Sequence, residues 1–121
     1  MASSDPGLHH LHHSLVTAGA RIYIGTGGGG LAFAEPQHAV LVLGPPRSGK
    51  TTALMIPNVL AAPGAVVSTS TKADVLHASV GSRSELVRCW LLDPSGTVNA
   101  PHGVTRLRWS PVCAAGQWNE A

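Results

Sequence analysis

Short apolar runs alternate along the chain with longer stretches in which apolar and polar residues mix. Three of the runs, residues 39–43, 65–68 and 87–92, are rich in aliphatic residues and are bounded by proline, glycine or aspartate. Such runs are typical of buried strands in a parallel sheet. The mixed stretches between them, residues 50–61 and 72–84, have lengths and ends that favour helices. Strands and helices in this order predict an α/β fold with right-handed crossovers and a parallel sheet.

Glycine-rich and polar residues occupy most of the remaining chain. Residues 21–24 and 31–34 flank six residues of which five are glycine, so we expect a short β-hairpin there. Residues 95–110 have no clear periodicity and are expected to form a loop. Pro57 should kink the helix that contains it or end the first part of that helix, because proline has no backbone N–H. Residues 1–20 are small, polar and rich in histidine, which favours a flexible lead-in.

Composition supports a folded domain but does not identify a partner. Hydrophobic residues make up 44% of the 121 residues and charged residues 12%, so the chain has apolar material to bury. The net charge of +2 is too small to indicate nucleic-acid binding by itself. No apolar run approaches the roughly 20 residues of a membrane helix, so we expect no transmembrane segment and a cytoplasmic chain.

The cysteines and histidines do not predict a metal centre. Cys89 and Cys113 are too far apart for a zinc motif, and reduced thiols are the simplest interpretation. His9 and His13 would share a face if their segment were helical. No cysteine or carboxylate joins them, so we expect only adventitious metal binding there.

A phosphate-binding motif follows the first of the three apolar runs. The segment Gly44-Pro45-Pro46-Arg47-Ser48-Gly49-Lys50-Thr51 matches the P-loop pattern G-x-x-x-x-G-K-[ST] between an expected strand and an expected helix. Its backbone N–H groups and the positive end of the helix should face phosphates. Lys50 should reach the terminal phosphates and Thr51 should bind Mg²⁺. We therefore predict ATP and Mg²⁺ as ligands of a site formed by Gly44, Pro45, Pro46, Arg47, Ser48, Gly49, Lys50, Thr51 and Thr52.

Three other stretches resemble nucleotide-binding motifs without meeting their requirements. Residues 25–30 fit G-x-G-x-x-G, but no helix is expected after them. Residues 71–74 resemble the T-K-x-D guanine reader of GTPases but follow too early a strand, so the start of a helix is the simpler interpretation. Residues 89–93 resemble a Walker B strand, yet Pro94 stands where a glutamate would be needed. A turn capped by Asp93 is favoured, and the catalytic residues stay unknown.

Several stretches resemble the TraG-like coupling proteins of type IV secretion and conjugation. The resemblance extends from about Ala39 to the C-terminus. The P-loop itself is generic, whereas the stretches around Ile56-Pro57-Asn58 and Arg108-Trp109-Ser110-Pro111 are more specific. The stretches that carry the resemblance are the P-loop and residues 55–60, 64–74, 92–96 and 107–112.

The resemblance implies a RecA-like ATPase that helps to move single-stranded DNA, together with its relaxase, into a type IV secretion channel. Full-length members of the family are homo-hexamers at the cytoplasmic face of the bacterial inner membrane. They carry transmembrane helices before this domain, and a Walker B strand and an arginine finger around or after it, none of which is identified here. We therefore expect a His-rich lead-in at residues 1–20 and an incomplete P-loop NTPase domain at residues 21–121. Its fold would be a partial RecA-like α/β fold preceded by a short β-hairpin.

Two other functions stay open on the sequence alone. The Gly44-Pro45-Pro46 start is shared with AAA+ ATPases, so another P-loop enzyme of that type, or a small kinase, is one alternative. A non-catalytic nucleotide-binding or assembly module is the other, because no hydrolytic acid is identified. An apolar strand ending in Asp-Glu downstream would favour the ATPases.

Overall fold

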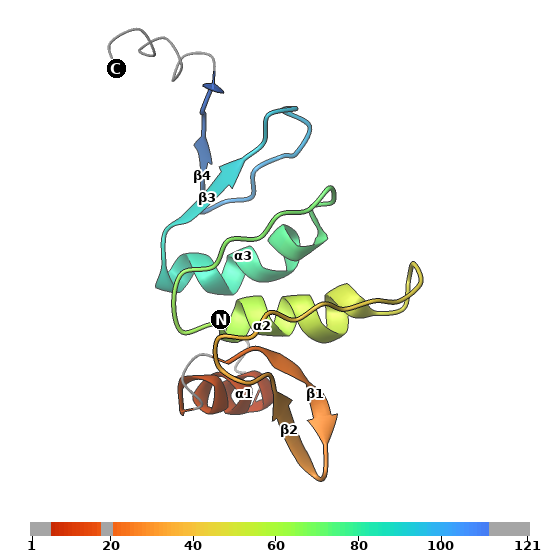
Figure 1. The fold of residues 1–121 in the computed structure, drawn as a ribbon. Coiled ribbons are helices and arrows are strands. Elements are labelled where there is room, and N and C mark those ends of the chain that lie inside the picture. Colours follow the sequence, from red (N-terminus) through yellow and green to blue (C-terminus); the bar gives the residue numbers. More distant parts are fainter. Residues whose placement is uncertain (1–5, 18–20, 112–121) are drawn as a thin grey trace, which may run out of the picture.

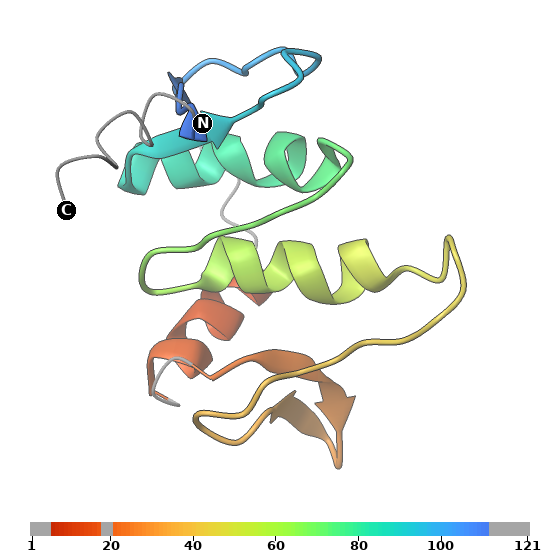
Figure 2. The same ribbon diagram turned by 45° about the horizontal axis from the view of Figure 1, so that its top comes forward.

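The computed structural model describes residues 6–17 and 21–111, in which two helices lie between two small β-structures (Figure 1). Helix α1 and the hairpin β1–β2 lie at one end, α2 and α3 are stacked in the middle, and β3 and β4 lie at the other end. Figure 2 shows the same stacking after a rotation. The elements are α1 (Pro6–Thr17), β1 (Tyr23–Gly27), β2 (Gly30–Phe33), the π-helix η1 (Thr51–Met55), α2 (Ile56–Ala61), α3 (Asp74–Leu86), β3 (Cys89–Leu92) and β4 (Val104–Leu107).

The expected hairpin is confirmed. Strands β1 and β2 are antiparallel, with Tyr23 opposite Phe33 and a bulge that shifts the register next to Tyr23. Gly28 and Gly29 form the turn with φ angles of 57° and 85°. Two consecutive left-handed residues are what a type I′ turn requires, and glycine adopts them without steric cost.

Helix α1 corrects the expectation of a flexible lead-in. The side chain of Leu11 is only 7% exposed and clusters with the fully buried Ala61 of α2. Tyr23, Leu31 and Phe33 of the hairpin pack against the same cluster. A short helix with no acidic residue in its first turn and no basic residue in its last depends on such packing, and the sequence of residues 1–20 does not show it. Residues 1–5 and 18–20 lie outside the described part of the chain.

The strand expected at residues 87–92 is present as β3, but its partner was not foreseen. Strand β3 pairs in parallel with β4, so that Cys89 lies opposite Val104 and Leu92 opposite Leu107. The expectation of a loop throughout residues 95–110 was therefore wrong. A four-residue strand leaves too short a pattern to recognise, and its pairing depends on a segment elsewhere in the chain.

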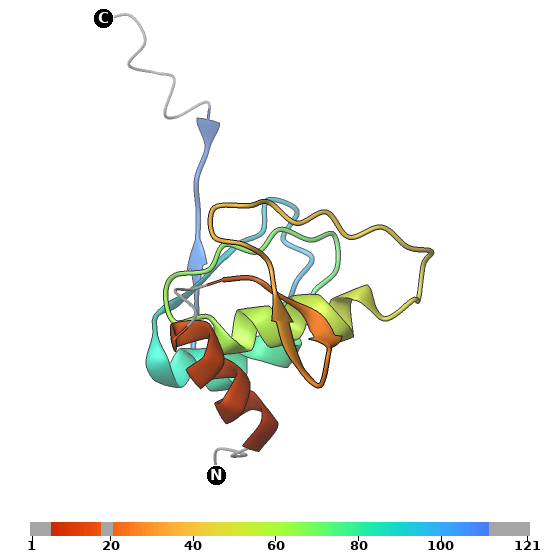
Figure 3. The same ribbon diagram turned by 60° about the horizontal axis from the view of Figure 1, so that its bottom comes forward.

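The other two expected strands do not form. Residues 39–43 and 65–68 run as irregular chain, and Figure 3 shows the segments that contain them on the side of the molecule opposite the helices. Leu41, Leu43 and Val67 are 81%, 83% and 92% exposed. Aliphatic composition favours a strand, but a strand also needs a neighbouring segment to complete its hydrogen bonds. The molecule is thus a mixed α/β structure with one antiparallel hairpin and one two-stranded parallel sheet.

Helix α3 is fastened to the end of α2 by Arg83. The expected helix at residues 72–84 is confirmed with both ends two residues later, and it buries Val75 and Val80. Arg83 is 7% exposed, and its two terminal nitrogens donate hydrogen bonds of 2.7 and 2.8 Å to the carbonyl oxygens of Ala62 and Gly64. These carbonyls follow the end of α2, where the helix leaves acceptors without intrahelical partners.

The described residues also bear on the membrane and metal expectations. None of the helices in the described part of the chain has the length and apolar character that crossing a bilayer requires. Among those residues, no three histidine, cysteine, aspartate or glutamate side chains gather in a way that could hold a metal ion. Cys89 carries a free thiol, and Cys113 lies outside the described part.

Candidate nucleotide-binding site

The P-loop residues form one exposed turn that leads into a helix. Residues 44–48 are exposed, and the amide of Ser48 donates a 3.4 Å hydrogen bond to the carbonyl oxygen of Pro45. Arg47 and Gly49 have positive φ angles of 62° and 81°, which make the turn tight. Lys50 then caps the helical stretch that begins at Thr51. The structure therefore brings the predicted phosphate-binding residues together at the start of a helix.

The Lys50 ammonium closes this loop from inside. Its Nζ donates hydrogen bonds to the carbonyl oxygens of Gly44 and Pro45, both at 2.7 Å, and to the Ser48 hydroxyl at 3.2 Å. A Cβ at Gly44 would lie 3.0 Å from Ser48 Oγ and 3.6 Å from Lys50 Cδ, so a side chain there would crowd the loop. An ammonium has three donors, and a phosphate oxygen would have to replace one of these acceptors.

The two threonines after Lys50 have different environments. Thr52 is exposed, and its hydroxyl donates a 3.1 Å hydrogen bond to the carbonyl oxygen of Gly49, which ties the helix start to the loop. Thr51 is partly buried and is the first residue of η1. An ammonium, a hydroxyl and the first N–H groups of a helix are the groups that bind phosphate and its Mg²⁺ in proteins, so this donor set fits a nucleoside triphosphate.

Pro57 accounts for the unusual first turns of the helix. The amide of Ile56 bonds to the carbonyl oxygen of Thr51, five residues earlier, which defines the π-helix η1. In an α-helix the ring of Pro57 would clash with the carbonyl of Ala53 and leave that carbonyl without its N–H partner. A wider turn avoids the clash. The expected interruption of the helix is thus a change from π to α geometry at Ile56.

Asn58 is a residue whose role sequence reasoning missed. In the sequence it stands out only as part of the family-like stretch Ile56-Pro57-Asn58. In the structure its side-chain amide accepts a hydrogen bond from the backbone N–H of Tyr23 and donates one to the Tyr23 carbonyl, at 2.9 and 2.8 Å. The only sequence signal was an asparagine in the interior of an expected helix, where its propensity is poor.

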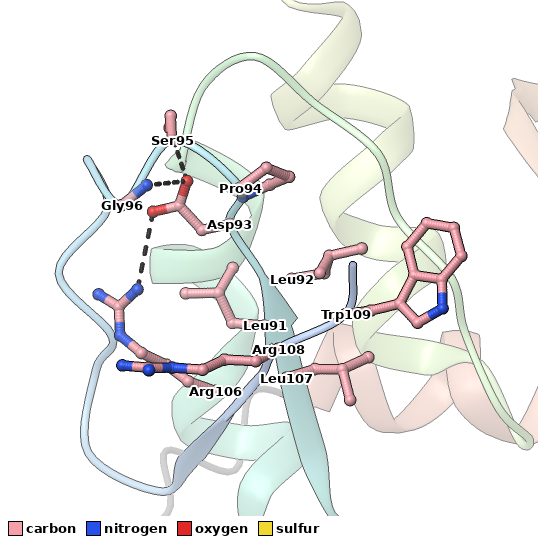
Figure 4. Close-up of a pocket in the computed structure, with 10 residues that line it drawn as sticks. All are labelled: Leu91, Leu92, Asp93, Pro94, Ser95, Gly96, Arg106, Leu107, Arg108 and Trp109. Atoms are coloured by element: carbon pink, nitrogen blue, oxygen red, sulfur yellow. Dashed lines mark hydrogen bonds and ion pairs between the residues drawn. The ribbon is translucent and has the colours of Figure 1, made fainter. Parts of the chain in front are cut away.

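Asp93 lies in a different turn, where its own chain satisfies it. Its Oδ1 accepts hydrogen bonds from the Ser95 hydroxyl at 2.7 Å and the Gly96 amide at 3.0 Å, and its Oδ2 accepts one from the Val98 amide at 2.8 Å (Figure 4). Arg106 Nη1 lies 3.7 Å from Oδ2, and the Asp93 side chain is 6% exposed. The hydroxyl of Ser95 and then the amide of Val98 lower the pKa of Asp93. The turn-capping interpretation is confirmed.

The hollow beside Asp93 is separate from the P-loop. It has a volume of about 400 Å³ and is lined by residues 91–96 and 106–109, at the ends of β3 and β4. Figure 4 shows Asp93 and its partners on one side of this hollow and the indole of Trp109 on the other. Arg106 also donates a hydrogen bond to the Val98 carbonyl, which closes the turn from residue 93 to residue 98.

The other two resembling motifs have ordinary structural roles. Residues 25–30 belong to the hairpin, so no helix follows their glycines. Asp74 is the first residue of α3, and its Oδ1 accepts a 3.2 Å hydrogen bond from the Val75 amide. The Lys72 amide donates to the Ser70 hydroxyl at 3.1 Å. The expected start of a helix at this stretch is therefore confirmed.

A comparison with models of protein families shows which family the chain belongs to. The family model described as type IV secretory system conjugative DNA transfer matches residues 8–98, about three quarters of the sequence. The chain belongs to this family. No curated protein and no solved structure matches it.

The family match covers most of α1 and all of the hairpin, the P-loop helix and the Asp93 turn. It begins well before Ala39, the start of the resemblance in the sequence. It ends before residues 108–111, so the expectation that this stretch is one of the more specific parts of the resemblance is not supported by the match. The conjugative DNA transfer family is therefore recognised through the first part of the chain, including the two elements that pack against the P-loop helix.

Proposed function

We propose that this chain binds ATP with Mg²⁺ at its P-loop, as part of a RecA-like ATPase domain in a DNA-transfer coupling protein. The observation that carries the proposal is the position of Lys50. Its ammonium lies in an exposed loop at the start of a helix and holds only acceptors of that loop. Family membership supports the same conclusion, because conjugative DNA transfer requires a source of energy for movement of the DNA.

Each group of the loop has a distinct task in this proposal. Backbone N–H groups from Arg47 to Thr51 bind phosphate oxygens, and Lys50 adds a compact positive charge at the terminal phosphates. The Thr51 hydroxyl is the ligand that this chain offers to Mg²⁺, which neutralises charge on the β- and γ-phosphates. The proposed partners of the whole protein are single-stranded DNA, a relaxase and secretion components, and its proposed form is a homo-hexamer at the cytoplasmic face of the inner membrane.

A second function is favoured by the state of Asp93. Its carboxylate is held by hydrogen bonds from its own turn and lies near Arg106, so Asp93 is not free to act as a catalytic acid or a metal ligand. A chain that binds ATP but does not hydrolyse it would be a nucleotide-binding module whose catalytic groups come from elsewhere. A different P-loop ATPase of the AAA+ type would also bind ATP through Lys50 but is less consistent with the family match.

Titration calorimetry with ATP and Mg²⁺ tests the proposal. Lys50→Ala should weaken binding at least about tenfold, which corresponds to ~1.4 kcal/mol. Lys72→Ala is the matched control, because Lys72 is the other lysine of the sequence and lies outside the P-loop, two residues before α3. The affinity of this variant should stay within about twofold of the parent. Equal affinities for the parent and a folded Lys50→Ala variant would show that the P-loop does not bind the nucleotide.

A further inference from the structure

Asn58 joins two parts of the molecule that are far apart in sequence. The side-chain amide of Asn58 makes three hydrogen bonds: it accepts from the Tyr23 N–H and donates to the Tyr23 and Leu54 carbonyl oxygens, at 2.9, 2.8 and 2.8 Å. All three bonds are partly buried, and Tyr23 lies 35 residues earlier in the chain. Both N–H donors and the oxygen of the amide are therefore used.

Tyr23 offers its backbone groups to α2 because of its position in the hairpin. It stands opposite Phe33, while the next bond of the ladder runs from the Ala34 amide to the Ile22 carbonyl at 2.8 Å. In an antiparallel pair, residues alternately direct their N–H and C=O groups toward the partner strand and away from it. The Tyr23 groups face away from β2, and Asn58 takes the place that a third strand would occupy.

The same helix carries the nucleotide loop at its other end. Thr51, Leu54 and Asn58 belong to one continuous helical stretch, η1 followed by α2. Asn58 lies about two helical turns, or ~10 Å, after Thr51. Strand β1 also contacts η1 directly. A bond that holds Asn58 therefore restrains the rotation of this helix about its axis, and with it the direction in which the Thr51 hydroxyl points.

We propose that Asn58 is a positioning residue of the nucleotide site. By holding the backbone of Tyr23, it fixes the P-loop helix on the hairpin so that Lys50 and Thr51 meet the phosphates and Mg²⁺ in one orientation. This inference rests on the proposed binding of ATP and adds a regulatory connection to it. Because coupling between two sites is reciprocal, ATP bound at the loop stabilises the contact between Asn58 and Tyr23.

Asn58→Asp is the most informative variant, because it keeps the size of the side chain and replaces its N–H donor group with an oxygen acceptor. A carboxylate oxygen then faces the carbonyl oxygens of Tyr23 and Leu54 in place of an N–H donor. Affinity for ATP with Mg²⁺ should fall about fivefold or more in protein that circular dichroism shows to be folded. Asn99→Asp introduces the same charge at an exposed loop residue and should change the affinity less than about twofold.

The contribution of Mg²⁺ to ATP affinity distinguishes a positioning role of Asn58 from a purely structural one. Affinities for ATP are measured with and without Mg²⁺ at a temperature where every variant is folded. If Asn58 orients the Thr51 hydroxyl, the gain in affinity from Mg²⁺ should shrink in Asn58→Asp and stay unchanged in Asn99→Asp. An Asn58→Asp protein that melts earlier but keeps the affinity and the Mg²⁺ gain of the parent would overturn the proposal.

Hydrogen exchange on the parent protein tests the same connection without a variant, and it decides the matter if Asn58→Asp does not fold. Saturating ATP with Mg²⁺ should slow exchange of the Tyr23 amide at least about threefold and leave the Trp90 amide in β3 unchanged. An unchanged Tyr23 amide in protein that binds ATP overturns only the role of Asn58. A parent protein that does not bind ATP overturns the proposed function and this inference together.

Discussion

The P-loop and the Asp93 turn have similar backbones, but the charged side chains Lys50 and Asp93 differ in their exposure to solvent. Each follows an apolar run, and each has a glycine with positive φ, 81° at Gly49 and 68° at Gly96. In each, a charged side chain bonds to its own turn. The Asp93 side chain is 6% exposed and has partners on both oxygens, whereas the turn that Lys50 closes is exposed along residues 44–48.

The difference shows how a binding loop is told from a structural turn with similar residues. Asp93 would lose several hydrogen bonds and the nearby Arg106 if it bound a metal or a water. Lys50 can exchange a loop carbonyl for a phosphate oxygen in contact with solvent, at the positive end of a helix. The binding loop therefore differs from the structural turn in the solvent access of its charged side chain and in the ease with which a ligand can replace that side chain's hydrogen-bond partners. The types of residue in the two turns do not separate them.

The largest expected effect is on catalysis: the chain should bind ATP but hydrolyse it very slowly. The chain alone should hydrolyse ATP at least about a thousandfold more slowly than 1 s⁻¹, a low-end enzyme rate, because the Asp93 carboxylate is held by its own turn and phosphoryl transfer also takes an oriented water and an arginine finger. Steady-state phosphate release measures this. Turnover near 1 s⁻¹ that Asp93→Asn abolishes would break the comparison and make Asp93 catalytic.

A matched pair of glycine substitutions comes next. Gly49→Ala and Gly96→Ala should each destabilise the fold by about 1–2 kcal/mol, because alanine is strained at positive φ, while neither new Cβ meets an atom closer than 3.7 Å. Only Gly49→Ala should also weaken ATP binding, by about tenfold. Denaturant titration and calorimetry give the two quantities. If Gly96→Ala weakened ATP binding equally, the Asp93 turn would belong to the nucleotide site.

The pH dependence of the stability of the fold tests whether the ionised Asp93 carboxylate stabilises its turn. Its hydrogen bonds lower the pKa of Asp93 below the ordinary value of 3.8, so the ionised form stabilises the folded state. This contribution is complete above about pH 4 and is lost as the pH falls through the lower pKa of the folded protein. Asp93→Asn should therefore remove part of the acid sensitivity seen in thermal melts between pH 5 and pH 2. An identical pH profile for the two proteins would show that the carboxylate adds no stability.

The smallest effect concerns the choice of nucleotide. The Asp74 carboxylate accepts a hydrogen bond at the start of α3, and the Lys72 amide bonds to Ser70 just before it, so we expect these residues to form a helix start and not a guanine reader. Affinities for GTP and ATP should differ by less than about tenfold, or ~1.4 kcal/mol. Competition between the two nucleotides in calorimetry provides the measurement. A stronger preference for GTP would show that residues 71–74 belong to the nucleotide-binding site.

Features that depend on a few adjacent residues were predictable from the sequence. The P-loop turn, the glycine hairpin, the start of α3 and the Asp93 cap were each expected at their positions, because turn chemistry and helix ends are decided by neighbours. The nucleotide site itself stays a prediction from the motif, to which the structure adds the exposure of the loop and the bonds of Lys50.

Features that depend on distant partners were decided only by the tertiary structure. Helix α1 forms because Leu11 meets Ala61, and β4 is a strand because β3 lies beside it. Residues 39–43 and 65–68 have the composition of strands but lack neighbouring strands, so they do not form them. The sequence by itself determined local turns, helix ends and the P-loop motif, since those interactions close within a few residues. Pairing across tens of residues, as between Asn58 and Tyr23, was decided by the fold, because neither residue's neighbours indicate its partner.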